Sequence, residues 1–307
     1  MEELAAWMWL SDSAESLTGD AVRLLAKFGS PEKISLAEQS AVAQIASKAL
    51  ADALRRNRSR YEGPEAKLRL ADFFASGGDL LTLNDPAYPQ HLRGITSPPL
   101  LLFRKGTLRE FDRTVAVIGT RSPTHRGYTM ARTIGAALAG EGYCVVSGMA
   151  RGIDTLAHCG ALDAGGKTAA VLPGPITFLY PPENVFLAED IVRNGALLAE
   201  NSPMVSIDRM PYSQKYRWVK RNRITSGLSE ALVVVEATDS GGSMHQVKFA
   251  VGQGRPIHVL KPDDIVPAPL RRGYEEAVAS GARPFTSVDD LMAHLPGERP
   301  ERQGRLD

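Results

Sequence analysis

The sequence predicts an α/β protein with a doubly wound, mostly parallel sheet and a small all-helical region ahead of it. From residue 114 to residue 260, apolar strands alternate with helical stretches. Residues 1–78 show instead only helical spacing of small and apolar side chains. We therefore expect a helical domain over 1–78, a sheet domain over 79–262, and short helices with a polar tail over 263–307.

The composition is that of an ordinary globular chain, with 23% charged residues and a formal net charge of +1. Such a charge identifies no partner, because clusters of opposite sign cancel in the sum. Cys144 and Cys159 fall on a predicted strand and a predicted helix, so we expect buried thiols in a reducing cytoplasm and no metal site. The apolar run at 5–10 is short and follows an acidic start, so neither a signal peptide nor a membrane span is expected.

The helical region is interrupted at 18–19, at 28–31 and at 62–64. Residues 24–31, Leu-Leu-Ala-Lys-Phe-Gly-Ser-Pro, look like the helix end and turn of a helix-hairpin-helix or sterile-alpha-motif-like module. A basic run at 55–60 ends one of the helices. We interpret this run as a solvated helix end, because the helix dipole favours cations there.

The strands of the sheet are predicted from apolar runs, which are typical of strands covered on both faces. They fall at 114–119, 143–147, 168–172, 196–200, 231–236 and 256–260. Ahead of them, the proline-rich segment 80–113 contains Leu100-Leu101-Leu102-Phe103, which we expect to form a short strand beside the main sheet. Ligands of such sheets bind at the carboxyl ends of the strands.

The first of these strands ends at Gly119, and a helix should follow with Ser122 as N-cap and Pro123 at its first position. A dinucleotide-binding turn would have the pattern G-x-G-x-x-G, but Arg121 occupies the place of the second glycine. We therefore expect no dinucleotide cofactor. The turn alone leaves two interpretations of equal weight: the guanidinium meets a phosphate, or it pairs with a carboxylate and closes the turn.

Other strand ends carry glycine, small hydroxyls and arginine, as in Ser147-Gly148, Arg151 and the stretch Ser-Gly-Gly-Ser at 240–243. Such loops present backbone N–H groups to anions, which favours phosphate binding. Asp154 and His158 are four residues apart on a predicted helix and could pair. We favour a structural role for them over a catalytic one, because the spacing places no nucleophile beside them.

Residues 215–223, Lys-Tyr-Arg-Trp-Val-Lys-Arg-Asn-Arg, contain five cations and two aromatic rings. Single-stranded nucleic acid is bound by this combination, because cations follow the phosphates while bases stack on the rings. The alternative is an amphipathic helix that buries Tyr216 and Trp218 and turns its arginines outward.

Taken together, these residues resemble the DNA-processing protein A (DprA, also Smf) family. The resemblance covers roughly residues 80–262, in the order of the family's motifs. The matching stretches are Tyr88-Pro89, Pro98-Pro99, 117–121, 146–154, Ala157-His158, 180–184, 221–229, Val235-Glu236 and 240–243.

This resemblance implies an extended Rossmann-like fold that binds single-stranded DNA without sequence preference, protects it and hands it to the RecA recombinase during natural transformation. It also implies a homodimer that works without a cofactor, a metal or catalytic turnover. The arginines carried over from the motifs are Arg121, Arg151, Arg221 and Arg223. The full set of expected DNA- or phosphate-binding residues is Gly119, Thr120, Arg121, Ser147, Gly148, Arg151, Lys215, Trp218, Lys220, Arg221, Asn222, Arg223, Ser240, Gly241, Gly242 and Ser243.

The sequence departs from the family pattern at Pro173-Gly174-Pro175, at 218–220 and at Gln246, which indicates a divergent member. A mobile-element or defence role would leave the same signals. One alternative is a phosphoribohydrolase of the related lysine-decarboxylase-like superfamily, but the stretch near residue 240 lacks the glutamate of that superfamily's motif. Another is a sensor that binds a nucleotide-derived signal at the strand ends without turnover.

Overall fold

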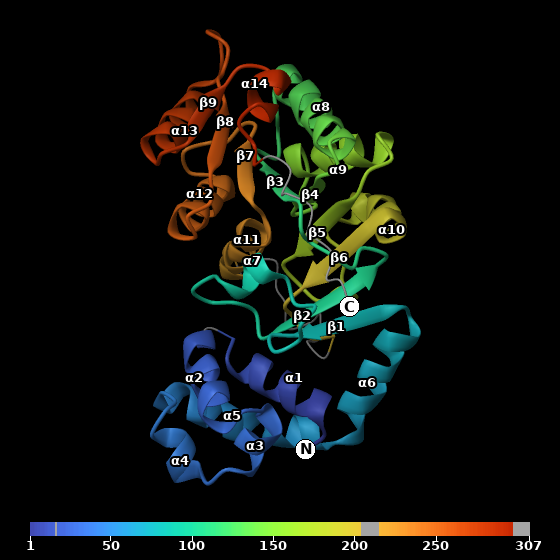
Figure 1. Ribbon diagram of the computed structural model, residues 1–307, viewed down its shortest axis with the longest axis vertical. Helices are drawn as coiled ribbons and strands as arrows, with labels where there is room; N and C mark the ends of the chain where they lie inside the picture. Colours follow the sequence, from blue (N-terminus) through green and yellow to red (C-terminus); the bar gives the residue numbers. More distant parts are fainter. Residues whose placement is uncertain (16, 204–214, 297–307) are drawn as a thin grey trace, which may run out of the picture.

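The computed structural model describes residues 1–15, 17–203 and 215–296 and contains one mixed sheet, flanked by helices (Figure 1). Its strands are β1 (Gly78–Thr82), β2 (Leu101–Gly106), β3 (Thr114–Ile118), β4 (Cys144–Ser147), β5 (Thr168–Leu172), β6 (Gly195–Ala199), β7 (Ala231–Val234), β8 (Ile257–Leu260) and β9 (Arg283–Phe285). They lie in the order β1-β2-β6-β5-β4-β3-β7-β8-β9. All neighbours from β6 to β9 are parallel, whereas β1 and β2 are antiparallel additions at one edge.

The helices before the sheet are α1 (Glu3–Ser13), α2 (Thr18–Phe28), α3 (Pro31–Leu36), α4 (Gln39–Ala43), α5 (Lys48–Glu62) and α6 (Pro64–Ala75). Those that follow are α7 (Gln90–Arg93), α8 (His125–Gly140), α9 (Ile153–Asp163), α10 (Val185–Asn194), α11 (Lys215–Leu228), α12 (Gly242–Gly252), α13 (Ala268–Ala279) and α14 (Val288–Met292). A short 3₁₀ helix, Pro182–Asn184, leads into α10.

The predicted doubly wound, mostly parallel sheet is confirmed, and the six predicted strands from 114 onward correspond to β3 to β8. The chain fills the sheet from β3 through β4 and β5 to β6, then returns to the other side of β3 for β7, β8 and β9. The switch in direction therefore falls between β3 and β7, where proteins of this topology bind ligands outside the carboxyl ends of the strands.

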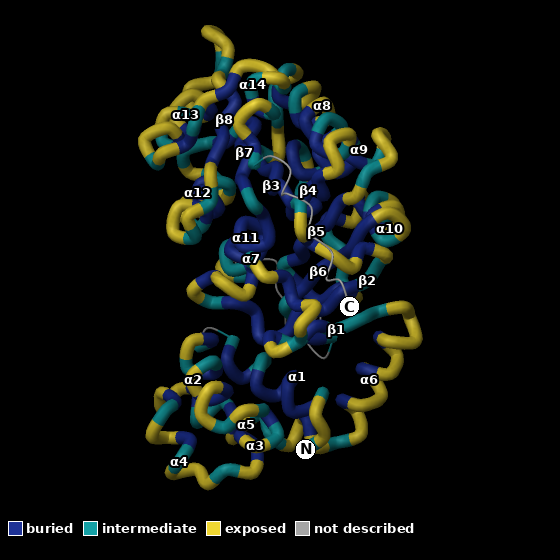
Figure 2. The backbone as a smooth tube through the Cα atoms, viewed as in Figure 1, coloured by how far each residue is buried: buried dark blue, intermediate teal, exposed yellow. Residues whose placement is uncertain are grey.

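The two faces of β3 explain why its sequence is apolar from Val115 to Ile118. Val115 and Val117 pack in the core formed with α8 and α9, whereas Ala116 and Ile118 pack in the core formed with α12. Alternate side chains of a strand point to opposite faces, so a strand covered on both sides needs no polar position. Figure 2 shows the resulting band of buried residues along the central strands.

The predicted start of the first sheet helix is wrong by a few residues. The structure begins α8 at His125, and Thr124 is the N-cap, with its hydroxyl accepting from the N–H of Gly127 at 3.1 Å. Ser122 and Pro123 belong to the preceding turn, where the N–H of Ser122 donates to the hydroxyl of Thr120. A hydroxyl two residues further along therefore takes the capping role.

The strands β1 and β9 were not predicted, and each extends one edge of the sheet. β1 pairs with β2, and the predicted strand at Leu100 to Phe103 is part of β2. β9 pairs with β8, so the chain beyond residue 262 contributes to the sheet as well as forming α13 and α14.

The N-terminal helices pack beside the β1 and β2 edge of the sheet (Figure 1), and their apolar residues continue into the core around β2 and β6. Trp9 of α1 is buried and donates from its indole N–H to the carbonyl of Leu54 in α5 at 2.7 Å. Among the described residues, no helix is both long and apolar enough to cross a membrane.

The close packing of α8 on α9 gives a test of the fold. A Cβ on Gly160 would lie 2.0 Å from the carbonyl oxygen of Arg132, whereas a Cβ on Gly140 would meet nothing within 4 Å. We expect Gly160→Ala to lower the free energy of unfolding by about 1–3 kcal/mol, because the two helix backbones must separate. Gly140→Ala is the control and should leave stability unchanged or raise it by about 0.5–1 kcal/mol. Equal urea midpoints for the two variants would contradict this packing.

Candidate functional site

The turn after β3 is held by residues from two other loops at the same edge of the sheet. The N–H of Thr120 donates to the carbonyl of Glu236 at 2.6 Å, and the N–H of Ile153 donates to the carbonyl of Thr120 at 3.1 Å. The hydroxyl of Ser243 donates to the carbonyl of Gly119 at 2.9 Å. Gly119 itself is required, because a Cβ there would lie 2.6 Å from the carbonyl oxygen of Glu236. The loops after β3, β4 and β7 therefore form one surface.

Arg121 is exposed on this surface and lies over an aromatic ring. Its guanidinium carbon is 5.4 Å from the centre of the Trp218 ring, in cation–π geometry. Trp218 is half-buried and meets Tyr180 edge to face, with ring centres 5.4 Å apart. We call Arg121, Trp218 and Tyr180 the cation–aromatic cluster. Among the described residues, no ion pair joins Arg121 to a carboxylate.

Arg151, from the loop after β4, is exposed next to this cluster. Its guanidinium is bound by the carboxylate of Glu183, and its charge also interacts with Tyr180. The hydrogen bond from Arg151 lowers the pKa of Glu183 below its ordinary value. Glu183 thus occupies a position at Arg151 that an external anion could take.

Ser147 and Gly148, which were expected to bind phosphate, are buried in the loop that leads to Arg151. The hydroxyl of Ser147 donates to the carbonyl of Val117 at 2.6 Å, and the N–H of Gly148 donates to the buried carboxylate of Asp154 at 3.1 Å. These bonds shape the loop that carries Arg151.

Arg221 is also buried, with 7% of its surface exposed. One of its Nη atoms donates to the carbonyl of Val171 at 2.5 Å, and its charge interacts with Asp154. A Cβ on Gly148 would lie only 1.9 Å from this guanidinium, so the glycine makes room for it. Arg221 therefore fixes α11 to the ends of β4 and β5.

Arg223 makes a second buried anchor and is 5% exposed. It forms hydrogen bonds to both carboxylate oxygens of Glu200, and its Nε donates to the carbonyl of Ser97 at 2.9 Å. Lys220 approaches the same carboxylate at 3.3 Å. The amphipathic alternative, with aromatic residues buried and arginines outward, is wrong for these two arginines, since both point inward.

The remaining expected residues lie at the two ends of this surface. Ser240 and Gly242 are exposed at the start of α12, and Gly241 is its N-cap. Asn222 is buried and donates from its side chain to the carbonyl of Gly242 at 3.2 Å. Lys215 begins α11, and its side chain is outside the described residues.

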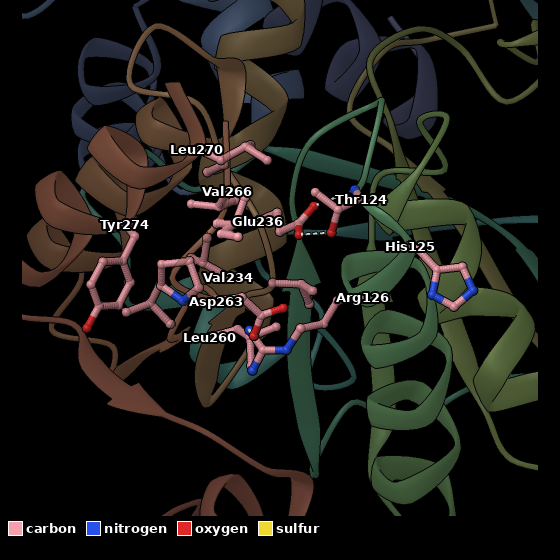
Figure 3. A pocket seen from close by; sticks show the side chains of 15 residues that line it. Thr124, His125, Arg126, Val234, Glu236, Leu260, Asp263, Val266, Leu270 and Tyr274 are labelled. Atoms are coloured by element: carbon pink, nitrogen blue, oxygen red, sulfur yellow. Dashed lines mark hydrogen bonds and ion pairs between the residues drawn. The ribbon is translucent and has the colours of Figure 1, made fainter. Parts of the chain in front are cut away.

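A pocket of about 170 Å³ is lined by Glu236, by the start of α8 and by the ends of β7 and β8 (Figure 3). Glu236 accepts hydrogen bonds from the N–H of Thr124 at 2.9 Å and from its hydroxyl at 2.5 Å. The carboxylate therefore occupies the N-terminus of α8, where a nucleotide phosphate binds in dinucleotide enzymes. An anion cannot enter there without meeting a negative charge, which disfavours the nucleotide-sensor and hydrolase alternatives.

Asp154 and His158 do not pair with each other. Asp154 accepts from the backbone of Gly148 and Ala150, while Nδ1 of His158 is 2.6 Å from the hydroxyl of Thr168. Burial lowers the pKa of His158 to about 3, so the ring is neutral near pH 7. Their hydrogen bonds support the loop after β4 and the neighbouring strands.

The cysteines and potential metal ligands add no chemistry to this surface. Cys144 is buried as expected, whereas Cys159 is only half-buried. Within 1–15, 17–203 and 215–296, no three His, Cys, Asp or Glu side chains gather in a way that could hold a metal ion.

Sequence reasoning assigned no role to Tyr180, Glu183 or Glu200, although the structure places Tyr180 against Trp218 and the two carboxylates against predicted cations. Tyr180 and Glu183 belong to the stretch 180–184 that carries the family resemblance. An aromatic residue in a loop that follows a buried strand was a usable signal for Tyr180. Neither carboxylate could be paired with its arginine from spacing, because the partners are 32 and 23 residues apart.

The sheet, its switch point and the loops that carry cations and aromatic rings at its edge define an extended Rossmann-like α/β protein. Residues 79–296 match the family described as DNA recombination-mediator protein A, and the chain belongs to this DprA/Smf family. It is 32% identical over 235 residues to the DNA processing protein DprA of Bacillus subtilis, covering 76% of each chain.

Two solved structures extend the comparison. The X-ray structure of DprA from Streptococcus pneumoniae superimposes with a TM-score of 0.78 at 25% identity, covering 97% of this chain and all of the other. The second is DNA processing protein A from Helicobacter pylori, described for its unique single-stranded DNA binding mode. It superimposes with a TM-score of 0.60 at 28% identity, and the match covers 71% of this chain and 96% of the Helicobacter pylori chain.

The buried ion pair around Glu200 predicts a pH-dependent stability. Burial alone would raise the pKa of Glu200, but Arg223 and Lys220 hold it below the ordinary value. The ion pair therefore contributes fully to the free energy of unfolding above the pKa of Glu200 in the unfolded chain, which is about 4.3. This contribution is lost as the pH falls through the lower pKa of Glu200 in the folded protein. Glu200→Gln should lower the free energy of unfolding at pH 7 by about 3–5 kcal/mol, because it leaves Arg223 buried and unpaired.

Urea unfolding at pH 7 and at pH 3 measures this effect, and the gap between wild type and Glu200→Gln should narrow at the lower pH. Glu189→Gln is the control, because Glu189 pairs with Arg193 in solvent and its loss should cost less than about 1 kcal/mol. A gap of the same size at both pH values would exclude the ion pair as its cause.

Proposed function

We propose that this protein binds single-stranded DNA without sequence preference, protects it and hands it to the RecA recombinase, acting as a homodimer without catalytic turnover. The observation that carries the proposal is the cation–aromatic cluster beside Arg151, in which Arg121 is exposed and both rings are half-buried. Membership of a recombination-mediator family and likeness to a relative described for its single-stranded DNA binding mode support it.

The chemistry of the cluster suits a single strand better than a duplex. The unpaired bases of a single strand can stack on Trp218 and Tyr180, while its phosphates meet Arg121 and Arg151. A duplex keeps the faces of its bases stacked inside and presents phosphates, sugars and base edges instead. Because every base has a π face, this mode of binding tolerates any sequence.

The expected site residues divide into two groups by their burial. Arg121, Arg151, Trp218, Ser240 and Gly242 reach the surface or its edge, and we assign the direct contacts to them. The buried arginines of α11 hold Trp218 in place from below, and Ser147 and Gly148 do the same for Arg151. Gly119, Thr120, Gly241 and Ser243 set the shape of the turns, and Lys220 is held by Glu200.

A mobility-shift titration with oligo-dT and with blunt duplex tests the function. We expect nanomolar-to-micromolar binding of oligo-dT at low salt and much weaker binding of duplex. The affinity for oligo-dT should fall steeply with salt, because each neutralised phosphate contributes about −0.7 to the slope of log K against log salt. Equal affinity for duplex, or no shift at low salt, would overturn the proposal.

Substitutions in the cation–aromatic cluster separate its two kinds of contact. Trp218→Ala should weaken oligo-dT binding by about 5- to 150-fold, since base stacking contributes about 1–3 kcal/mol per base, and Trp218→Phe should retain most of it. Arg121→Ala should reduce the salt slope by about 0.7, which is the contribution of one phosphate contact. Arg132→Ala is the control, because it removes an exposed arginine that pairs with Asp163 and does not belong to the cation–aromatic cluster. Equal losses for Arg121→Ala and Arg132→Ala would show that only overall charge matters.

A further inference from the structure

The segment between β5 and the first turn of α10 contains three aromatic residues, Phe178, Tyr180 and Phe186. The last of them, Phe186, has no role in the site described above. Tyr180 belongs to the cation–aromatic cluster, but Phe186 leaves 78% of its surface exposed. Among the large apolar side chains that the structure describes, Phe186 is as exposed as Leu36, which is 77% exposed on the helical region. A phenylalanine in this position loses the stabilisation that burial of its ring would provide.

Phe186 shares a helix face with Glu183, the carboxylate that binds Arg151. Pro182–Asn184 and α10 form one nearly continuous helical stretch, so Glu183 and Phe186 are three residues apart and share a face. Asn184, Ala188 and Ile191 occupy the opposite, buried side. Side chains on a helix lean towards its N-terminus, which brings the ring of Phe186 towards Glu183 and the guanidinium that Glu183 binds.

The carboxylates around Phe186 all have arginine partners, although two of them share one arginine and leave a net charge of −1. The carboxylate of Glu183 is paired with Arg151, and those of Glu189 and Asp190 are both paired with Arg193. The first turn of α10 therefore combines an exposed ring with a neighbouring cation, which is the combination already present at Arg121 and Trp218.

We propose that Phe186 is a second base-stacking residue, which extends the single-stranded DNA path from the cation–aromatic cluster past Arg151 and across the start of α10. This inference rests on the proposed function. In it, Arg151 contacts a phosphate and Phe186 stacks on the base of an adjacent nucleotide.

Titration of oligo-dT against Phe186→Ala tests the contact. We expect about 5- to 150-fold weaker binding with an unchanged salt slope, because no charge is lost. Leu36→Ala, which removes an equally exposed apolar side chain from the helical region, should bind as wild type does. A thermal unfolding curve for Phe186→Ala should match that of wild type.

A spectroscopic readout distinguishes stacking from a merely structural effect. In a Trp218→Phe background, the indole introduced by Phe186→Trp should lose fluorescence when oligo-dT binds, because a base stacks on it. If wild type binds oligo-dT and Trp218→Ala weakens it, but Phe186→Ala binds normally and the new indole shows no quenching, this inference is overturned while the proposed function stands. If wild type binds no oligo-dT, the proposed function itself fails.

Discussion

The position of α11 depends on two arginines buried beneath it. Arg221 reaches the carbonyl of Val171 and the charge of Asp154, and Arg223 binds Glu200 with both terminal nitrogens. Removing one partner from such a pair leaves a charge uncompensated in the interior, which makes the arrangement sensitive to a single substitution. These anchors present Trp218 at the rim, so the surface chemistry depends on charges that never reach the surface.

Much of the sheet could be predicted from the sequence, because strands covered on both faces are mostly apolar. β3 to β8 follow this pattern and contain only a few buried polar residues, such as Thr114, Thr168 and His258. β1 and β9 lie at the edges and include half-exposed or exposed residues, which leaves no continuous apolar run. The capping hydroxyl of α8 was misplaced for a related reason. Two hydroxyl residues, Ser122 and Thr124, both precede the helix, and only the three-dimensional turn decides between them.

The sequence predicted which residue types make up the candidate site, but not which of these side chains reach the surface. The run at 215–223 indicated cations and aromatic rings together, but spacing alone could not show which cations face inward. That choice depends on Glu200 and Asp154, which come from other strand ends. Arg121 and Arg151, each alone in a glycine-containing loop, are exposed. Isolated cations in turns were therefore better predictors of exposure than the densest cluster.

The carboxylate of Glu236 at the start of α8 has a consequence for what this fold can select. The helix N-terminus that captures a single phosphate in related sheets is already satisfied from within the chain. A free mononucleotide would therefore find no strong anchor and could engage only one ring and one guanidinium at the rim. A polymer can engage several such weak contacts at once, and its effective concentration at each rises once the first is made. Recognition by this surface would then depend on the length of the strand, and the pool of cellular nucleotides would compete poorly for it.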